Sequence, residues 1–420
     1  MISKTFFLFF LAFFFIKICS SATEPASVAQ SAAETIAHLK KTCSLESVGS
    51  DIELLEGFVP TKAEGLSKED VRRIVFSTQS KKIPSLKFGC ISIVPLTYQD
   101  GRYKKFTTAD QIFFVFVKER CLPTHYEGPR RDRLLFVVKH YAGNKFSQKK
   151  VEDELANLCV LKRTFSSQGF SANFPRLSFA EAFYKYPNPD RSLDHSAPYR
   201  YVALIHAAKG ENLWDLVENY IKTENEKEKS QLRHDVLTAS ARLGEVLAHF
   251  HLKFMEGKGC PYRRATRLQR LKSDVSDISK CQTTIHGDLH FKNIFWDKTT
   301  NIISWVDISA LMDRPSPLNF LEELGYIYGS LINFTTSLFG KGEIEFLKRR
   351  TLIADIYSAF LKAYLEVFHT HRGGVPYADL ERSVKSMVLP LAMLRAVGTG
   401  PSGDVTGPAW REIVQRVALA

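Results

Sequence analysis

The sequence between residues 285 and 294 reads IHGDLHFKNI, and WVD follows at residues 305–307. Apolar, strand-like residues flank both segments, and the polar turn at residues 297–301 is typical of a hairpin. We therefore expect Asp288, Asn293 and Asp307 on loops beside a small sheet. Mg²⁺ prefers oxygen ligands, usually one or two carboxylates together with substrate phosphates. These residues predict a magnesium phosphate site, and the alternative is a polar hairpin whose Asp residues cap turns.

The order His-Gly-Asp-x-His-x-x-Asn, followed by two apolar residues and Asp, resembles the catalytic core of the aminoglycoside phosphotransferase and choline kinase family. Members of that family act on small molecules and are related to the protein kinases. The resemblance implies that Asp288 accepts the proton of a substrate hydroxyl and that Asn293 and Asp307 bind Mg²⁺. It also implies that His286 and His290 shape the loop, and that ATP and Mg²⁺ are the cofactors.

Two strands could present the lysine that binds phosphate in this family. Phe136-Val137-Val138-Lys139 has the family's pattern, and the segment ending at Lys118 has nearly the same shape. A helix predicted over residues 151–165 follows Lys139 promptly and carries Glu154, with leucines spaced as in the family. The resemblance implies that Lys139 and Glu154 form the ion pair that positions the nucleotide phosphates. Glu152 is the alternative acid.

The family's hinge is expected directly after the apolar strand at residues 201–205. Backbone groups of about His206 to Ala208 would hydrogen-bond adenine there, and we give His206 no catalytic role. Gly210 allows a turn before the next helix. The loop at residues 99–110 holds only Gly101, whereas protein kinases carry several glycines there so that backbone N–H groups approach the phosphates.

The order of these elements predicts an α+β, bilobal protein-kinase-like fold, with a small antiparallel β-sheet lobe and a larger, mainly helical lobe. We expect a signal peptide at residues 1–22, an N-terminal extension at 23–84, the small lobe at 85–208 and the helical lobe at 209–420. Ser67 to Asp70 is a capping box for a short helix within the extension. Strands are predicted at residues 86–98, 111–120, 133–141 and 201–205, and helices at 213–220, 232–250, 320–328, 344–368, 379–397 and 408–417. Residues 224–229 are interpreted as a charged bridge.

The first 22 residues have the pattern of a secretory signal. Lys4 precedes an apolar run of about twelve residues, and small residues suited to cleavage follow. This run is short of the roughly 20 residues that span a bilayer as a helix. We expect a secreted or extracytoplasmic protein, periplasmic if bacterial, without a membrane span after cleavage. An uncleaved anchor is the alternative.

The cysteines are consistent with export. Six remain after the leader, at positions 43, 90, 121, 159, 260 and 281, and an even count permits disulfides. Cys90 and Cys121 lie near the ends of neighbouring predicted strands and are the first pair to test. Cys159 is expected on an apolar helix face as a buried thiol.

The chain is basic, with a net charge of +12, or +10 without the leader residues Lys4 and Lys17. This surplus favours anionic partners such as nucleotides, and the alternative is a solvated basic surface. We expect a nucleotide and a small-molecule hydroxyl acceptor as partners, and no nucleic acid. The predicted function is an ATP-dependent phosphotransferase that moves the γ-phosphoryl group to a hydroxyl of a small molecule. The alternatives are an exported pseudokinase-type binding module without catalysis and a kinase of a protein or glycan.

Overall fold

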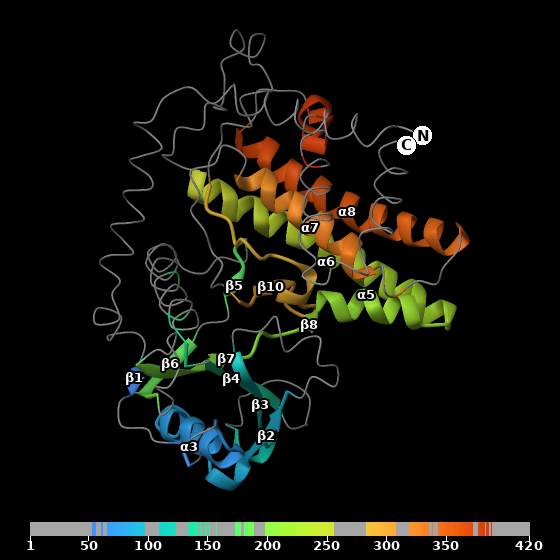
Figure 1. Ribbon diagram of the computed structural model, residues 1–420. Coiled ribbons are helices and arrows are strands. Elements are labelled where there is room, and N and C mark those ends of the chain that lie inside the picture. Colours follow the sequence, from blue (N-terminus) through green and yellow to red (C-terminus); the bar gives the residue numbers. More distant parts are fainter. Residues whose placement is uncertain are drawn as a thin grey trace, which may run out of the picture.

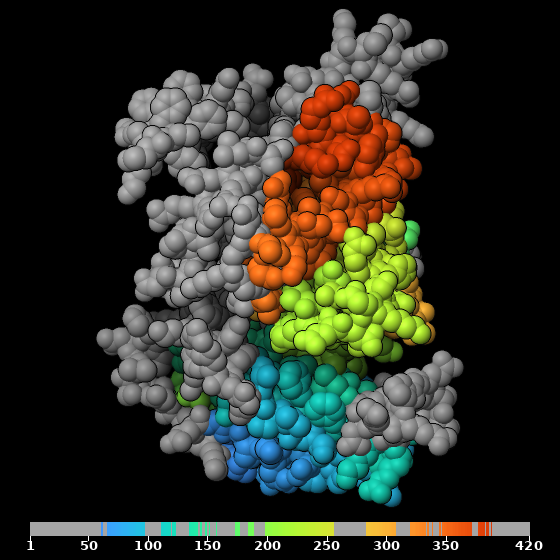
Figure 2. Space-filling model, turned by 90° about the vertical axis from the view of Figure 1, so that its right-hand side faces the viewer, coloured from blue at the N-terminus to red at the C-terminus, as the bar shows by residue number. Residues whose placement is uncertain are grey.

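The computed structural model describes two lobes connected through strand β8 (Glu211–Asn212) (Figure 1). The described residues are 53–55, 60–61, 65–96, 109–122, 133–141, 143–144, 148, 151, 157, 173–177, 180–188, 198–255, 283–307, 319–335, 338, 343–372, 377–382, 384–385 and 388. Figure 2 shows the small lobe in blue and cyan, the first helices of the large lobe above it, and the last helices above those. The predicted signal peptide, Cys159, Glu152 and Glu154 lie outside the described residues, as does the predicted helix at 408–417.

The small lobe contains a six-stranded sheet in which neighbouring strands run antiparallel, except for the parallel pair at one edge. Its order is β1 (Glu53–Leu55), β6 (Ala180–Pro187), β7 (Tyr199–His206), β4 (Arg133–Tyr141), β3 (Ala109–Val117) and β2 (Ile91–Pro95). In β7, Val202 and Leu204 join the core of the small lobe, whereas Tyr201, Ala203 and Ile205 join the core of the large lobe. Alternate side chains of a strand point to opposite faces, and both faces of β7 are buried here, so residues 201–205 are apolar without interruption, as predicted.

Helix α3 (Lys68–Gln79) covers the outer face of this sheet. The predicted capping box is confirmed, because Ser67 accepts from the backbone of Asp70, whose carboxylate accepts from the backbone of Ser67. Val71, Ile74 and Val75 are buried in the same apolar core as the strands. These residues belong to the predicted N-terminal extension and pack on the small lobe; the division of the chain at residue 84 stays a prediction.

The prediction that Cys90 and Cys121 pair is confirmed. They form a disulfide with a Cα–Cα distance of 6.3 Å, which joins the turn before β2 to the turn after β3. The predicted strand at residues 86–98 was too long at its start. Residues Phe88–Cys90 form a 3₁₀ turn, closed by the bond from Cys90 N to Lys87 O at 2.8 Å. Gly89 at its centre favours a turn over a strand.

The large lobe has a four-stranded sheet beside its helices. The order is β5 (Arg176–Leu177), β10 (Ile302–Trp305), β9 (Ile294–Asp297) and β8. Strands β9 and β10 form the predicted hairpin, with Ile294 opposite Trp305. Asp297 stabilises its turn by accepting hydrogen bonds from Thr299 N at 3.1 Å and Thr300 Oγ1 at 2.7 Å.

The described part of the large lobe also contains the helices α5 (Leu213–Lys222), α6 (Glu226–Met255), α7 (Asn319–Thr335) and α8 (Glu343–Arg372). Residues 377–382, 384–385 and 388 are helical too, in agreement with the helix predicted at 379–397. The charged bridge predicted at residues 224–229 was too long, because α6 begins at Glu226, where the Asn225 side chain accepts from Lys227 N and Glu228 N at 3.1 and 3.2 Å; residues 224 and 225 connect α5 to α6. Helices α6 and α8 approach closely at Gly244, where an added Cβ would lie 2.1 Å from Phe360 O.

The α+β, bilobal, protein-kinase-like class predicted from the sequence is confirmed by this arrangement of a mostly antiparallel sheet lobe and a helical lobe. Among the described helices, none is at once long and apolar enough to cross a membrane.

Candidate active site

The loop that carries Asp288 is held by the side chain of its neighbour His286. The ring of His286 is buried, with Nε2 3.1 Å from Val306 O and Nδ1 3.4 Å from Asp288 N. A carbonyl can only accept and a backbone N–H can only donate, so Nε2 carries the proton and Nδ1 accepts. His286 thereby connects the loop to the residue before Asp307, as its predicted role in shaping the loop requires. Gly287 adopts φ +84°, which glycine adopts at little cost.

Asn293 connects the two predicted acids. Its backbone carbonyl accepts from Val306 N at 3.0 Å, and its Nδ2 donates to Asp288 O at 3.0 Å. Because Nδ2 donates within the loop, Oδ1 is the amide atom suited to a cation. Asp307 has φ +58°, a conformation that is uncommon outside glycine and clusters at functional sites. The structure thus brings Asp288, Asn293 and Asp307 together at one end of the β9–β10 hairpin.

Lys139 extends from the small lobe to this group. It lies on β4 between Ile112 of β3 and Ala203 of β7, and its Nζ is 3.6 Å from Asp307 Oδ1. The Lys139 side chain is 19% exposed and that of Asp307 is 40% exposed, so the ion pair is partly screened by solvent. The contact joins the two lobes at the predicted phosphate site. Glu154, the predicted partner of Lys139, lies outside the described residues.

The predicted hinge follows β7. His206 is exposed and Ala208 is partly buried, whereas the N–H of Ala207 donates to Leu135 O at 2.9 Å. Gly210 turns the chain with φ +97°, and an added Cβ would lie 2.2 Å from Trp296 O. Only glycine fits so close to the β9 backbone, which confirms the turn expected there. Adenine binding by His206 and Ala208 stays a prediction.

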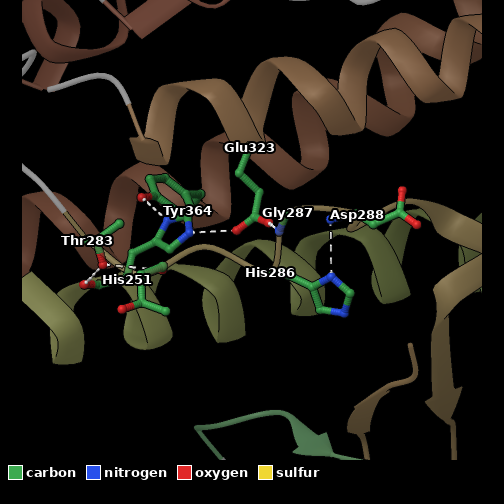
Figure 3. A network of polar contacts seen from close by, with 8 residues as sticks. His251, Thr283, His286, Gly287, Asp288, Glu323 and Tyr364 are labelled. Carbon is green, nitrogen blue, oxygen red and sulfur yellow. Dashed lines mark hydrogen bonds and ion pairs between the residues drawn. The ribbon is translucent and has the colours of Figure 1, made fainter. Parts of the chain in front are cut away.

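A buried acid on α7, Glu323, contacts the loop that carries Asp288, and the sequence did not reveal it. Its Oε1 accepts from Gly287 N at 3.0 Å, and its Oε2 is 2.8 Å from His251 Nε2 (Figure 3). His251 Nδ1 in turn is 2.8 Å from the hydroxyl of Tyr364. His251 is therefore a buried hydrogen-bonding residue on α6.

Tyr326 lies three residues after Glu323 on the same helix and donates a hydrogen bond to Asp288 Oδ1. The ring of His290 stacks against that of Tyr326, with His290 Nε2 3.8 Å from the same oxygen. Burial lowers the pKa of His290, and the charge of Asp288 opposes this shift only in part. His290 is therefore a neutral ring that contacts the loop. A helix was predicted at residues 320–328, but its sequence pattern did not indicate a contact with the loop that carries Asp288.

The donor set fits Mg²⁺. Within the described ranges, no group of three or more His, Cys, Asp and Glu side chains is placed to bind a metal ion. The predicted set is smaller, with one carboxylate from Asp307 and one amide oxygen from Asn293. Mg²⁺ often takes few ligands from the protein and the rest from phosphates and water. These two residues could hold the ion when a nucleotide supplies the phosphates.

No protein-family model matches the chain, and its sequence matches no curated protein. Solved structures that it resembles include a glucosamine kinase (crystal form B), 14% identical, with a TM-score of 0.34 over 74% of this chain and 88% of that one. A glucosamine kinase in complex with glucosamine, ADP and inorganic phosphate is 14% identical, with a TM-score of 0.35 over 84% of this chain and 83% of that one. Aminoglycoside phosphotransferase APH(3'')-Id from Streptomyces rimosus is 13% identical, with a TM-score of 0.29 over 77% of this chain and 98% of that one.

Proposed function

We propose that this protein is an ATP-dependent phosphotransferase that moves the γ-phosphoryl group of ATP to a hydroxyl of a small molecule. The observation that carries the proposal is the contact between Lys139 of the small lobe and Asp307 of the large lobe, at 3.6 Å. Residues far apart in the chain meet at the end of the hairpin that also holds Asp288 and Asn293. A lysine, an acid–amide pair for Mg²⁺ and a second acid are the groups that phosphoryl transfer uses.

Each residue then has a distinct role. Asp288 orients the acceptor hydroxyl and takes its proton, while Asn293 and Asp307 hold Mg²⁺. When bound, Mg²⁺ would offset negative charge on the phosphate oxygens. Lys139 adds a second positive charge to the phosphates from the small lobe. Catalysis of this kind rests on positioning and electrostatics rather than on covalent chemistry of the protein.

The nucleotide contacts complete the proposal. The backbone of His206 and Ala208 would hold adenine where β7 leaves the small lobe, and Glu154 would pair with Lys139. The leader at residues 1–22 supports export, so we propose a secreted or extracytoplasmic protein. The donor of the phosphoryl group would then be ATP available in that compartment.

The second candidate is an exported pseudokinase-type binding module without catalysis. One observation favours it: the loop at residues 99–110 carries only Gly101, so the sequence lacks the glycines that usually let backbone N–H groups approach the phosphates. The intact acid, amide and acid at positions 288, 293 and 307 favour the enzyme. A kinase of a protein or glycan would use the same groups and differ in its acceptor.

The test compares Asp288→Ala with Asp297→Ala, which removes an acid from the nearby hairpin turn. Transfer from ATP is measured against panels of small alcohols, sugars and proteins, and nucleotide binding is measured by the thermal shift with MgATP. We expect Asp288→Ala to lower transfer by about 10²–10⁴-fold, as for loss of a general base, with the thermal shift retained. Asp297→Ala should keep its transfer rate.

Transfer by Asp288→Ala at the wild-type rate would refute the assignment of the base. A wild-type protein that shows a thermal shift with MgATP but no transfer to any acceptor would favour the binding module. Transfer to proteins or glycans alone would favour a macromolecular acceptor.

A further inference from the structure

We propose that Tyr326 is a positioning residue for Asp288, whose hydroxyl fixes one carboxylate oxygen so that the other faces the acceptor. This inference rests on the proposed function and assigns a role to a side chain that the predicted motif does not contain. Tyr326 is on α7, well after the loop in the sequence, and it reaches Asp288 only in the folded protein.

The direction of the hydrogen bond is set by chemistry. An ionised carboxylate can only accept, so the hydroxyl of Tyr326 donates to Asp288 Oδ1. His290 Nε2 is 3.8 Å from the same oxygen, beyond the range of a hydrogen bond. Among the residues that the structure describes, Tyr326 is thus the one side chain that donates to this carboxylate. The other oxygen, Oδ2, remains for an acceptor hydroxyl.

Helix α7 can hold this donor in place because it is anchored on both sides of Tyr326. Leu324 is fully buried and Ile327 is 1% exposed, so the backbone on either side of the tyrosine lies in the core. Glu323 accepts from Gly287 N at 3.0 Å. One turn of α7 therefore holds the backbone of the loop through Glu323 and the carboxylate of Asp288 through Tyr326.

The carboxylate gains orientation from this arrangement. The terminal torsion of an Asp side chain is broad and roughly two-fold, so packing alone defines it weakly. The Asp288 side chain is 37% exposed, which lets solvent and an acceptor reach it but also leaves it room to turn. Figure 3 shows its carboxylate pointing away from the Glu323–His251 pair. The hydrogen bond from Tyr326 is then what selects one rotation of the carboxylate, and a base must be oriented before it can take a proton efficiently.

The experiment compares Tyr326→Phe with Tyr328→Phe. Tyr328 is on the same helix and stacks on Tyr357, with ring centroids 4.2 Å apart, so its variant controls for loss of a tyrosine hydroxyl from α7. We expect Tyr326→Phe to lower kcat by about ten-fold, equivalent to about 1.4 kcal/mol, with the KM for ATP within about two-fold of wild type. A merely structural tyrosine would change KM and stability together, so thermal unfolding is measured on both variants. Tyr328→Phe should leave kcat unchanged.

A second measurement does not depend on activity. Fluorotyrosine is placed at position 326 or 328, and the fluorine NMR signal is compared between Asp288 and Asp288→Asn backgrounds. We expect the signal at position 326 to shift and that at position 328 to stay. An unmoved signal at position 326 would overturn the contact and with it the proposal.

The outcomes separate this inference from the function on which it rests. An active wild type with wild-type kcat in Tyr326→Phe overturns the role of Tyr326 and leaves the transferase intact. A wild type that transfers no phosphoryl group to any acceptor overturns the proposed function, whatever the fluorine signals show.

Discussion

The strongest test of the reasoning about the loop is to remove the carboxylate of Glu323. This side chain is 1% exposed, and its two oxygens contact Gly287 N at 3.0 Å and His251 Nε2 at 2.8 Å. A carboxylate can only accept, so His251 donates to Glu323 through Nε2, and its Nδ1 is 2.8 Å from the hydroxyl of Tyr364. Glu323→Ala leaves two buried N–H donors without an acceptor.

The size of the effect follows from these two contacts. A hydrogen bond to a charged group contributes roughly 1.5–3 kcal/mol net, and a buried donor left without a partner costs about 1–3 kcal/mol. Glu323→Ala removes two such contacts at once. We therefore expect Glu323→Ala to lower the free energy of unfolding by about 3–5 kcal/mol.

Glu323→Gln should lose less. Its amide oxygen can still accept from Gly287 N, and its amide nitrogen can donate to His251 once the ring takes its other tautomer, with Nδ1 donating to Tyr364. We expect a loss of about 1–2 kcal/mol, close to that of one hydrogen bond. The assay is chemical denaturation, with the unfolding free energy taken from the linear extrapolation.

Glu322→Ala is the matched control, because it removes a partly buried acid from the same turn of α7. We expect it to cost less than about 1 kcal/mol, because the contacts of a partly exposed acid contribute less than those of a buried one. If Glu323→Ala costs no more than Glu322→Ala, the Glu323 contacts do not support the loop, and this account of α7 is wrong.

Three further predictions concern the small lobe. Lys139→Met removes the positive charge 3.6 Å from Asp307, so it should raise the KM for ATP about ten-fold in a kinetic assay. The control Lys118→Met should change the KM for ATP by less than about two-fold. Reduction of the Cys90–Cys121 disulfide should lower the free energy of unfolding by about 3–4 kcal/mol, because the two cysteines are 31 residues apart and the bond restricts the unfolded chain. Acidification should destabilise the protein through His140, whose pKa burial lowers to about 4 from the usual 6.5. Below pH 6.5 the unfolded state binds more protons than the folded state, so the free energy of unfolding falls by about 3 kcal/mol down to pH 4.

Each of these has its own control. An equal rise in KM for Lys118→Met would mean that Lys139 is not the phosphate-binding lysine. The Cys90→Ala/Cys121→Ala variant should have a lower free energy of unfolding than the oxidised wild type, and added reductant should not lower it further. A double variant as stable as the oxidised wild type would contradict the role of the disulfide. In His140→Gln, the free energy of unfolding should fall less between pH 6.5 and pH 4 than it does in the wild type. An equal fall in both proteins would mean that other groups cause the pH dependence.

Local spacing made much of the site predictable. Residues 285–294 and 305–307 lie next to the strands that position them, so their order alone placed Asp288, Asn293 and Asp307 at one end of a hairpin. The capping box of α3 was equally readable, because Ser67 and Asp70 are three residues apart. The residues that carry the proposed chemistry were therefore accessible without coordinates.

Long-range packing decided what the sequence could not. The sequence showed that α7 is apolar, but Glu323 and Tyr326 contact residues 36 and 38 positions earlier in the chain. The role of a carboxyl group within an apolar helix depends on its partners, and these come together only in the folded protein. The parallel edge strand β1 likewise pairs with a segment more than a hundred residues away, between Glu53 and Ala182, and no local pattern specifies such a partner.

The sequence by itself determined which side chains carry the proposed chemistry and on which strands and turns they lie, because short-range pattern sets local structure. The tertiary structure alone decided which buried groups hold those side chains in position, because burial and hydrogen-bond direction depend on segments that meet only when the two lobes fold. Lys139 joins Asp307, and α7 supports Asp288, for that reason.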